Sequence, residues 1–262
     1  MRSIDLFARK FTQAFYARDW SGALEPSVFQ LSTAEAYAVQ DLVAERRVQR
    51  GEKIVGYKVG CTGEAIRSQF GLNEPISGRL FSPHLHEEAT FVNRNNYVNC
   101  AVEPEMVLTM GADLCGTHLP DDQLRDAIEY VSPGIELHNF KFWFDPPTSQ
   151  ELICSGGIHA GLIVGESRAS PKQLSFEHEL FSVRKNGDLI AQASASEIMG
   201  GPIHSLRWLV DSLTLRGLSL RKGSLVIPGS PVELVRVDED IELCVEIEGV
   251  GVVVSNFRGQ GV

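Results

Sequence analysis

The segment that most constrains the fold is an apolar run at residues 101–110 that carries two carboxylates, Glu103 and Glu105. Its composition predicts a β-strand, and because strand side chains alternate between faces, both carboxylates point to the same side. Residues 134–138 form a second apolar segment, which holds a third acid, Glu136. Two carboxylates this close repel each other unless a cation lies between them. Three carboxylates on apolar strands therefore suggest an all-oxygen site for a hard divalent cation, Mg²⁺ or Mn²⁺.

A plainer interpretation of Glu103 and Glu105 stays open at this point. Alternating charged residues on a strand usually form a solvated face opposite a core face. Pro104, between them, donates no ladder hydrogen bond, so we expect this strand to lie at a sheet edge or to be bulged there. Bulges are common beside active sites. Features elsewhere in the sequence are needed to decide between a solvated face and a cation site.

Composition and charge exclude several classes of protein. The chain has 262 residues, 43% of them hydrophobic, which suffices for one large domain with a small appendage. Its net charge of −10 and pI of about 5.2 argue against nucleic acid or an anionic membrane as partner. No apolar run reaches the ~18 residues of a membrane span, and early charges break the pattern of a signal peptide. Five scattered cysteines are typical of reduced thiols, so we expect a cytoplasmic protein.

Two helices are predicted before the first strand. Apolar residues recur at helical spacing over residues 4–19, and a capping box precedes a second helical segment at residues 33–49. We expect both helices to pack on the main body or on another subunit. The predicted organisation is therefore an N-terminal helical segment, residues 1–52, followed by a β-rich main domain, residues 53–262.

Residues 54–60 predict the first strand, which carries Lys58 between apolar neighbours. A lysine in a strand most often lies at an edge or on the surface. The alternative is a cation beside the carboxylates, where it would contact an anionic substrate or move protons. Beyond this strand we expect a loop at residues 75–83. His84 and His86 do not have the spacing of a zinc site, so a solvated loop is expected there too.

The second half of the chain predicts more strands than helices. The expected elements are helices at residues 63–70, 120–131 and 202–216, an aromatic loop at 140–148, a hairpin at 179–194, and strands at 225–230 and 241–256. Strands do not alternate with helices along the chain. This order argues against a doubly wound sheet or a TIM barrel and favours a β-rich α+β fold.

Several segments together resemble one family, the fumarylacetoacetate hydrolase superfamily, in its branch of 2-oxo-4-pentenoate hydratases and 4-oxalocrotonate decarboxylases. They occur in the family's order from about residue 50 to residue 257. The matching segments are residues 56–60 (Gly-Tyr-Lys-Val-Gly) with Thr62, 71–81, 102–106 (Val-Glu-Pro-Glu-Met), 127–131 with Pro133 and Glu136, 200–202, 228–230 (Pro-Gly-Ser) and 246–251.

The resemblance implies a fold and a site. The fold is a mixed β-sandwich roll, like the C-terminal domain of fumarylacetoacetate hydrolase, with N-terminal helices added. One divalent cation, Mg²⁺ or Mn²⁺, is held by Glu103, Glu105 and Glu136. The resemblance also implies Lys58 and Ser230 as catalytic residues, with Gly229 joining these two in contact with the substrate.

The activity implied is that of a hydro-lyase of the 2-oxopent-4-enoate hydratase kind. Such an enzyme adds water to a 2-hydroxy-dienoate or 2-oxo-alkenoate through a metal-stabilised enolate, in the catabolism of aromatic meta-cleavage products. The alternatives are a metal-dependent 2-oxo-dioate (4-oxalocrotonate-type) decarboxylase, an acylpyruvate-type C–C hydrolase, and a non-catalytic assembly partner. The expected partners are a small 2-oxo or 2-hydroxy carboxylic acid and further copies of the chain, or a related decarboxylase or hydratase.

One segment departs from the branch. Its members commonly carry an Asp-Asn pair just before a glycine-rich strand, whereas residues 152–157 here read Leu-Ile-Cys-Ser-Gly-Gly. Glu151, Asp145 and His159 are candidate replacements. The departure bears on the reaction and the substrate more than on the metal site.

Overall fold

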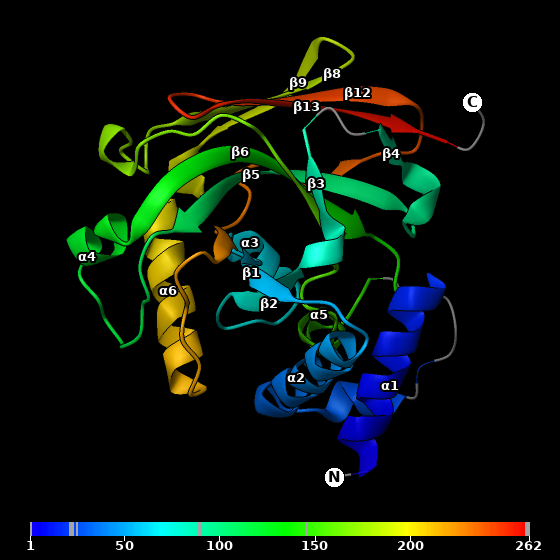
Figure 1. The fold of residues 1–262 in the computed structure, drawn as a ribbon. Helices are drawn as coiled ribbons and strands as arrows, with labels where there is room; N and C mark the ends of the chain where they lie inside the picture. Colours follow the sequence, from blue (N-terminus) through cyan, green and yellow to red (C-terminus); the bar gives the residue numbers. More distant parts are fainter. Residues whose placement is uncertain (1, 21–23, 25, 89–90, 145, 260–262) are drawn as a thin grey trace.

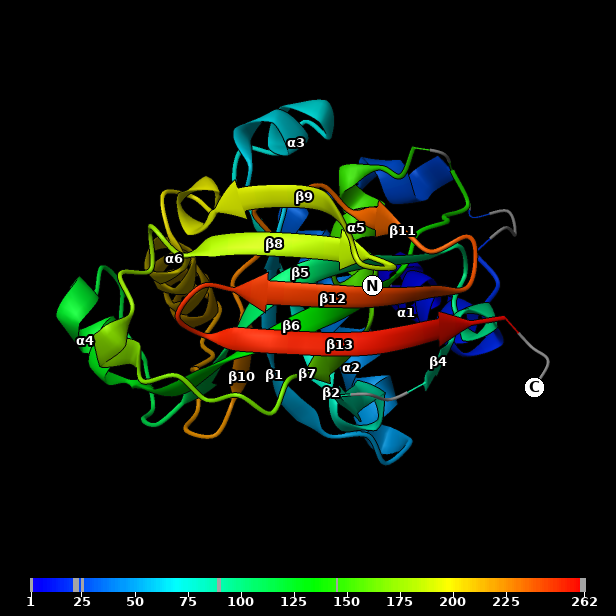
Figure 2. The ribbon, with the colours of Figure 1, turned by 90° about the horizontal axis from the view of Figure 1, so that it is seen from above.

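The chain folds into two stacked β-sheets with helices at one end and one side (Figures 1 and 2). The computed structural model describes residues 2–20, 24, 26–88, 91–144 and 146–259. The larger sheet has the strand order β2-β1-β10-β5-β6-β7-β3, with β11 also paired to β5, and the smaller has the order β4-β13-β12-β8-β9. This arrangement confirms a mixed α+β fold of the β-sandwich roll type.

The larger sheet consists of β1 (Ile54–Gly60), β2 (Ile76–Phe81), β3 (Leu85–Glu87), β5 (Cys100–Met110), β6 (Ile128–Asn139), β7 (His159–Val164), β10 (Leu225–Ile227) and β11 (Val235–Arg236). The smaller consists of β4 (Phe91–Asn93), β8 (Leu180–Lys185), β9 (Asp188–Ser194), β12 (Ile241–Ile247) and β13 (Gly251–Arg258). The α-helices are α1 (Arg2–Ala17), α2 (Thr33–Gln49), α3 (Glu64–Gln69), α4 (Asp121–Asp126), α5 (Ser149–Ser155) and α6 (Pro202–Leu215).

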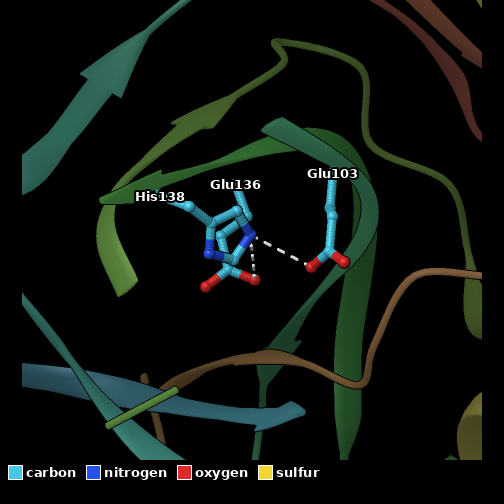
Figure 3. A group of neighbouring side chains, drawn as sticks. All are labelled: Glu103, Glu136 and His138. Atoms are coloured by element: carbon cyan, nitrogen blue, oxygen red, sulfur yellow. Dashed lines mark hydrogen bonds and ion pairs between the residues drawn. The ribbon is translucent and has the colours of Figure 1, made fainter. Parts of the chain in front are cut away.

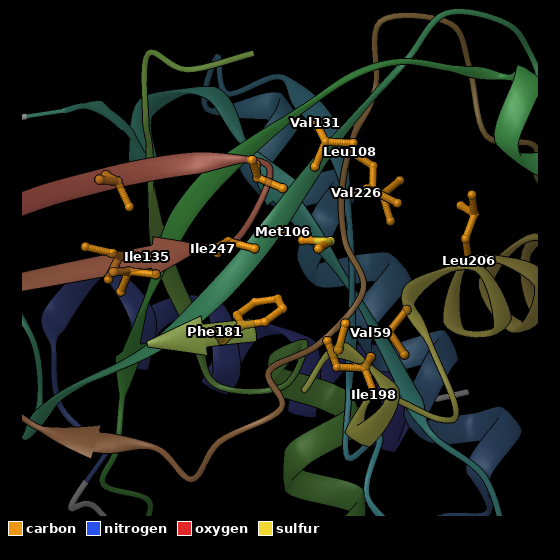
Figure 4. Close-up of a cluster of buried hydrophobic side chains, with 14 of the residues drawn as sticks. Val59, Met106, Leu108, Val131, Ile135, Phe181, Ile198, Leu206, Val226 and Ile247 are labelled. Atoms are coloured by element: carbon orange, nitrogen blue, oxygen red, sulfur yellow. The ribbon is translucent and has the colours of Figure 1, made fainter. Parts of the chain in front are cut away.

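The main hydrophobic core lies between the two sheets. Alternate residues of β5, among them Met106 and Leu108, pack with Ile135 of β6 against Phe181 and Ile247 of the smaller sheet (Figure 4). Helix α6 closes one side of this core through Leu206 and its neighbours. Because side chains on a strand alternate, the intervening residues of β5 must point away from the sandwich, and these include Glu103 and Glu105.

The larger sheet curls around that second face. A small cluster joins Leu80 of β2, Val107 of β5, Leu162 of β7 and Ile227 of β10. Strands β2 and β7 therefore contact each other although four strands lie between them in the hydrogen-bonded order. The curled face encloses polar side chains as well as apolar ones, and this enclosed face holds the candidate site.

The N-terminal helices pack on the main body through a second apolar cluster. Phe11 of α1 contacts Trp143 edge to face, and Phe29 meets Phe144 in the same way. The cluster continues to Ile153 of α5. Residues 142–144 of the predicted aromatic loop are therefore held by aromatic contacts with the N-terminal segment. In the described part of the chain, none of the helices has the length and apolar character needed to cross a membrane.

Several predicted elements are confirmed. Helices α1, α2, α3 and α6, strand β1, the β8–β9 hairpin and the β12–β13 pair all lie where the sequence patterns predict them. The capping box before α2 forms in both directions between Ser32 and Glu35. All five cysteines are free thiols.

Other predictions are wrong for a common reason. Residues 75–83 are mostly strand β2 rather than a loop, and His86 lies on the short strand β3, which pairs with β7. The helix predicted at 120–131 stops at Asp126, and β6 begins at Ile128 because its residues pair with β5. Helix α5 was not predicted. In each case long-range strand pairing or packing outweighs the local pattern.

The expectation for Pro104 is also wrong. β5 lies inside the sheet, and its register with β6 is continuous through Pro104, shifting instead between Thr109 and Met110. On its other side, β5 pairs with β11 at residues 101–102 and with β10 at 108–109. Pro104 falls in the interval between those two short neighbours, where the chain from residue 228 to 234 crosses instead of a strand. An imino acid is tolerated in such an interval.

Candidate active site and metal centre

Strand register brings the predicted carboxylates together on the enclosed face. Glu103 of β5 lies directly opposite Glu136 of β6. His138, two residues further along β6, points to the same side as Glu136. One ligand atom from each of Glu103, Glu136 and His138 lies within 4.8 Å of the others (Figure 3). His138 was not predicted as a member of this group, although the i, i+2 spacing from Glu136 could have indicated it.

The imidazole of His138 lies between the two carboxylates. Its Nε2 is 3.0 Å from Oε2 of Glu103 and 3.6 Å from Oε2 of Glu136 (Figure 3). Glu136 and His138 are buried, whereas Glu103 is partly accessible. The solvated-face interpretation of Glu103 and Glu105 is therefore wrong for Glu105, which is fully buried like Glu136, and Glu103 is the carboxylate at the rim.

Glu105 lies beside this group and has a separate backbone partner. Its Oε2 accepts a hydrogen bond of 3.0 Å from the backbone N–H of Gly229. Burial raises the pKa of Glu105 well above its ordinary value, and the charges of Glu136 and Glu103 add to that effect. A cation placed among these carboxylates would oppose this shift, because its positive charge favours the ionised form of Glu105.

Lys58 is buried in β1 and reaches the same carboxylates. Lys58 is only 2% exposed, so the interpretation of this lysine as a surface residue is wrong. The Nζ atom donates to Oε1 of Glu136 at 2.6 Å and to the carbonyl of Gly157 at 3.2 Å. Burial lowers the pKa of Lys58, but Glu136 and Glu103 outweigh it and raise the pKa above its ordinary value.

His159 of β7 binds the same oxygen of Glu136. Its Nδ1 is 2.8 Å from Oε1, which thus has both Lys58 and His159 as partners. Burial lowers the pKa of His159 to about 4, so the ring is neutral at pH 7. Burial alone would raise the pKa of Glu136, but Lys58, His138 and His159 hold it below its usual range.

The departure from the family pattern lies next to this lysine. Residues 152–157 form the end of α5 and the turn into β7, and the carbonyl of Gly157 is the acceptor for Lys58. Of the candidate replacements, His159 joins the cluster. Glu151 instead forms a capping box with Thr148 at the start of α5, and Asp145 lies outside the described residues.

Gly229 and Ser230 lie on the crossing segment beside β5, and they differ in what they contact. The amide of Gly229 binds Glu105, and a Cβ at Gly229 would come within 2.6 Å of Thr62. The hydroxyl of Ser230 donates to the carbonyl of Val232 at 3.0 Å, within its own loop. Gly229 thus touches the carboxylate group directly, while the hydroxyl of Ser230 is engaged with its own turn.

The residues present fit a divalent cation. Four buried polar atoms of the cluster have no hydrogen-bond partner among the described residues: Oε1 of Glu105, Oε2 of Glu136, Nδ1 of His138 and Nε2 of His159. Buried carboxylate oxygens without a donor are unfavourable unless a positive charge meets them. Oxygen atoms of acidic side chains are the ligands that Mg²⁺ and Mn²⁺ favour, so the donor set suits such an ion.

Comparison with known proteins confirms the resemblance, although no family model matches the chain. A 2-keto-4-pentenoate hydratase from Paraburkholderia xenovorans is 25% identical over 259 residues, covering 96% of this chain and 93% of the relative. A 4-oxalocrotonate decarboxylase from a Pseudomonas species is 26% identical over 230 residues, covering 88% and 89%. The chain thus resembles hydratases and decarboxylases of one branch along most of its length.

Solved structures confirm the fold. A 4-oxalocrotonate decarboxylase from Pseudomonas putida G7, complexed with magnesium and adipate, superposes with a TM-score of 0.93. It is 23% identical and the match covers 98% of this chain and 97% of that one. A fumarylpyruvate hydrolase from Pseudomonas aeruginosa, in complex with Mn²⁺ and pyruvate, shares the fold at a TM-score of 0.63 over 78% of this chain and 89% of that one, with 16% identity.

Proposed function

We propose that this chain is a metal-dependent hydratase that adds water to a 2-hydroxy-dienoate or 2-oxo-alkenoate, as in the catabolism of aromatic meta-cleavage products. The observation that carries the proposal is the buried Lys58–Glu136 pair set among Glu103, Glu105 and two histidines. The chain-long similarity to 2-keto-4-pentenoate hydratases supports the choice of reaction. A cytoplasmic location and a homo-oligomeric state belong to the same proposal.

Glu103, Glu105 and Glu136 would hold the cation, Mg²⁺ or Mn²⁺. Glu136 offers Oε2, since its Oε1 is engaged by Lys58 and His159. Glu105 offers Oε1, since its Oε2 accepts the amide of Gly229. When bound, the ion supplies Lewis-acid stabilisation of negative charge on a chelating 2-oxo or 2-hydroxy acid.

Lys58 would hold the proton that the reaction moves. An ammonium group has three donors, and two of those of Lys58 are used by Glu136 and Gly157. The third N–H is left for the substrate. Lys58 donates to the carboxylate of Glu136 at 2.6 Å, so its ammonium form suits the site and acts as a positive charge or proton donor. Gly229 positions Glu105, and Ser230 presents the turn that would meet the substrate carboxylate.

A second candidate is a metal-dependent decarboxylase of a 2-oxo-dioate. The 26% identity over 230 residues with a 4-oxalocrotonate decarboxylase favours it about as strongly. Both reactions need the same electron sink next to a carboxylate, so the metal site does not separate them. The reactions differ in whether CO₂ leaves.

The deciding experiment measures turnover of 2-hydroxypenta-2,4-dienoate and 4-oxalocrotonate with Mg²⁺ or Mn²⁺, followed by ultraviolet absorbance and CO₂ release. Loss of the dienol without CO₂ supports the hydratase, and CO₂ release supports the decarboxylase. The substitution Glu103→Gln should abolish either activity, while the matched control Glu246→Gln, on an exposed position of β12, should not. Cleavage of an acylpyruvate instead, or no turnover with any of these acids, would overturn the proposal and leave the hydrolase or the assembly partner.

A further inference from the structure

We propose that His138 is a ligand of the cation through Nε2, which makes the centre a mixed oxygen and nitrogen site. Such a site prefers a first-row transition ion such as Mn²⁺ over Mg²⁺. The inference deepens the proposed function and rests on it in one respect, the presence of a cation at Glu103 and Glu136. It adds a ligand to the three acids that the sequence predicted, which alone describe an all-oxygen site.

The distances around His138 match those between ligands of one ion. Protein oxygen and imidazole ligands lie about 2.1 Å from Mg²⁺ or Zn²⁺, so two ligands at right angles around such an ion are roughly 3 Å apart. Nε2 of His138 is 3.0 Å from Glu103 Oε2 and 3.6 Å from Glu136 Oε2. Figure 3 shows that the three side chains, from β5 and β6, converge on the same point.

A simple hydrogen bond explains less of this geometry. A single N–H on Nε2 can serve Glu103 at 3.0 Å, but it leaves Oε2 of Glu136 without a donor. That oxygen belongs to a residue with no exposed surface. A cation at the point of convergence would meet both carboxylate oxygens and the ring nitrogen at once, which removes the unpaired buried oxygen.

The two histidines of the cluster have different positions relative to Glu136. His159 binds Oε1, the oxygen that Lys58 also binds, whereas His138 faces Oε2, the oxygen left free. Glu136 thus uses one oxygen for the protein and keeps the other for the ion. His159 is accordingly a positioning residue for Glu136, and it serves as the matched control for His138.

An imidazole ligand changes which ion the site favours. Carboxylate and water ligands suit Mg²⁺, while imidazole suits first-row transition ions, whose affinity generally exceeds that of Mg²⁺ at nitrogen-containing sites. Mg²⁺ also dehydrates reluctantly and keeps several waters. We therefore expect loss of His138 to weaken Mn²⁺ binding by at least about tenfold, the lower end of what loss of even an outer-shell partner does. Mg²⁺ binding should change several-fold less.

The test is pulsed electron paramagnetic resonance of the whole protein loaded with Mn²⁺ and no substrate. Wild-type protein should show the modulation of one directly bound ¹⁴N nucleus, replaced by the ¹⁵N pattern when the protein is labelled with ¹⁵N-histidine. His138→Gln should lose this coupling, and His159→Gln should keep it. The labelled wild type shows whether a histidine is bound even where one variant fails to fold, and the coupling in the other variant then identifies which histidine it is. Bound Mn²⁺ without nitrogen coupling, or coupling that persists in folded His138→Gln, overturns the inference.

Metal titrations test the predicted preference for Mn²⁺ over Mg²⁺. Mn²⁺ and Mg²⁺ dissociation constants are measured for wild type, His138→Gln and His159→Gln, and the Mn²⁺-to-Mg²⁺ ratio should fall only in His138→Gln. An unchanged ratio would contradict the proposal. Failure of the proposed function is distinguishable, because nitrogen coordination without turnover of either acid leaves the ligand set intact and removes the reaction. Turnover of either acid by protein that shows no nitrogen coordination keeps the proposed function and overturns the role of His138.

Discussion

Two buried ion clusters in this molecule differ in whether their carboxylate oxygens have hydrogen-bond donors. Under the N-terminal helices, Glu52 accepts from Arg47 Nε at 2.7 Å through one oxygen and from the hydroxyl of Tyr16 through the other. Arg47 also lies over the rings of Phe15 and Phe81. In this cluster both carboxylate oxygens of Glu52 have donors within the protein.

The cluster on the enclosed face of the larger sheet is left incomplete. One oxygen of Glu105 and one of Glu136 have no partner in the described part of the chain, although both residues are fully buried. Similar residue types therefore serve two purposes. A cluster whose carboxylate oxygens are both paired ties helices to a sheet, and one with unpaired carboxylate oxygens is suited to receive a positive charge. Substitutions in each cluster test this difference.

The largest expected effect concerns Lys58. Lys58→Met removes the proton donor and should lower kcat by at least about 10²-fold, within the range of general acid–base catalysis. Cation binding should persist, because Glu103 and Glu136 remain. Steady-state kinetics and a Mn²⁺ titration measure the two properties. Lys58→Arg is the control that keeps the charge, and kcat near the wild-type value in Lys58→Met would contradict the role given to this lysine.

The next effect concerns the satisfied cluster. Arg47→Met leaves Glu52 buried without its charged partner, which should lower the free energy of unfolding by about 3–5 kcal/mol. Activity per folded molecule should stay near that of the wild type. Urea unfolding, with kinetics at a temperature where both proteins are folded, measures these quantities. A loss of kcat without a loss of stability would show that this cluster also belongs to the active site.

The same contrast explains how much the sequence could predict. Glu103, Glu105 and Glu136 were predicted because acids inside apolar strands are visible in the sequence itself. The partners of Lys58 and the position of His159 depend on β1, β6 and β7 meeting across the curled sheet. No local pattern contains that information. The i, i+2 spacing of Glu136 and His138 was visible, but it acquires meaning only when Glu103 lies opposite Glu136.

The fold was predictable to a similar extent. Amphipathic helices with caps, such as α2 and α6, and the hairpin turned by Asn186 and Gly187 are specified by local sequence. Strand β2 and the start of β6 were missed because their conformation is fixed by pairing with β1 and β5. Pro104 was misplaced for the same reason, since an interval between two neighbouring strands inside a sheet has no sequence signature of its own.

Divalent cations should stabilise the protein through the incomplete cluster alone. A ligand at 100 times its dissociation constant adds about 2.7 kcal/mol of stability when it binds only the folded state. We therefore expect Mn²⁺ to raise the Tm of wild-type protein by several degrees, and that of Glu103→Gln by much less. Glu52→Gln should lower the starting Tm and keep the full shift. Differential scanning calorimetry with and without EDTA measures this, and an equal shift in Glu103→Gln would place the ion elsewhere.

The smallest effects are expected in the pH dependence of stability, where Glu52 of one cluster and Glu105 of the other should contribute with opposite signs. Burial alone would raise the pKa of Glu52, but His84, Tyr16 and Arg47 hold it at about 2. Its contribution is therefore complete above the ordinary value of about 4.5 and is lost as pH falls towards 2. The pKa of Glu105 is raised instead, so in metal-free protein its contribution to stability is lost as pH rises above its ordinary value of 4.5.

Relative to wild type in EDTA, Glu52→Gln should reduce the loss of stability below pH 4.5. Glu105→Gln should reduce the loss above it. Added Mn²⁺ should remove the pH dependence due to Glu105 from the wild type and leave that due to Glu52 unchanged. Unfolding free energies between pH 3 and 8 test this, and the same sign in both variants would mean that the two clusters do not differ in the way their unpaired oxygens indicate.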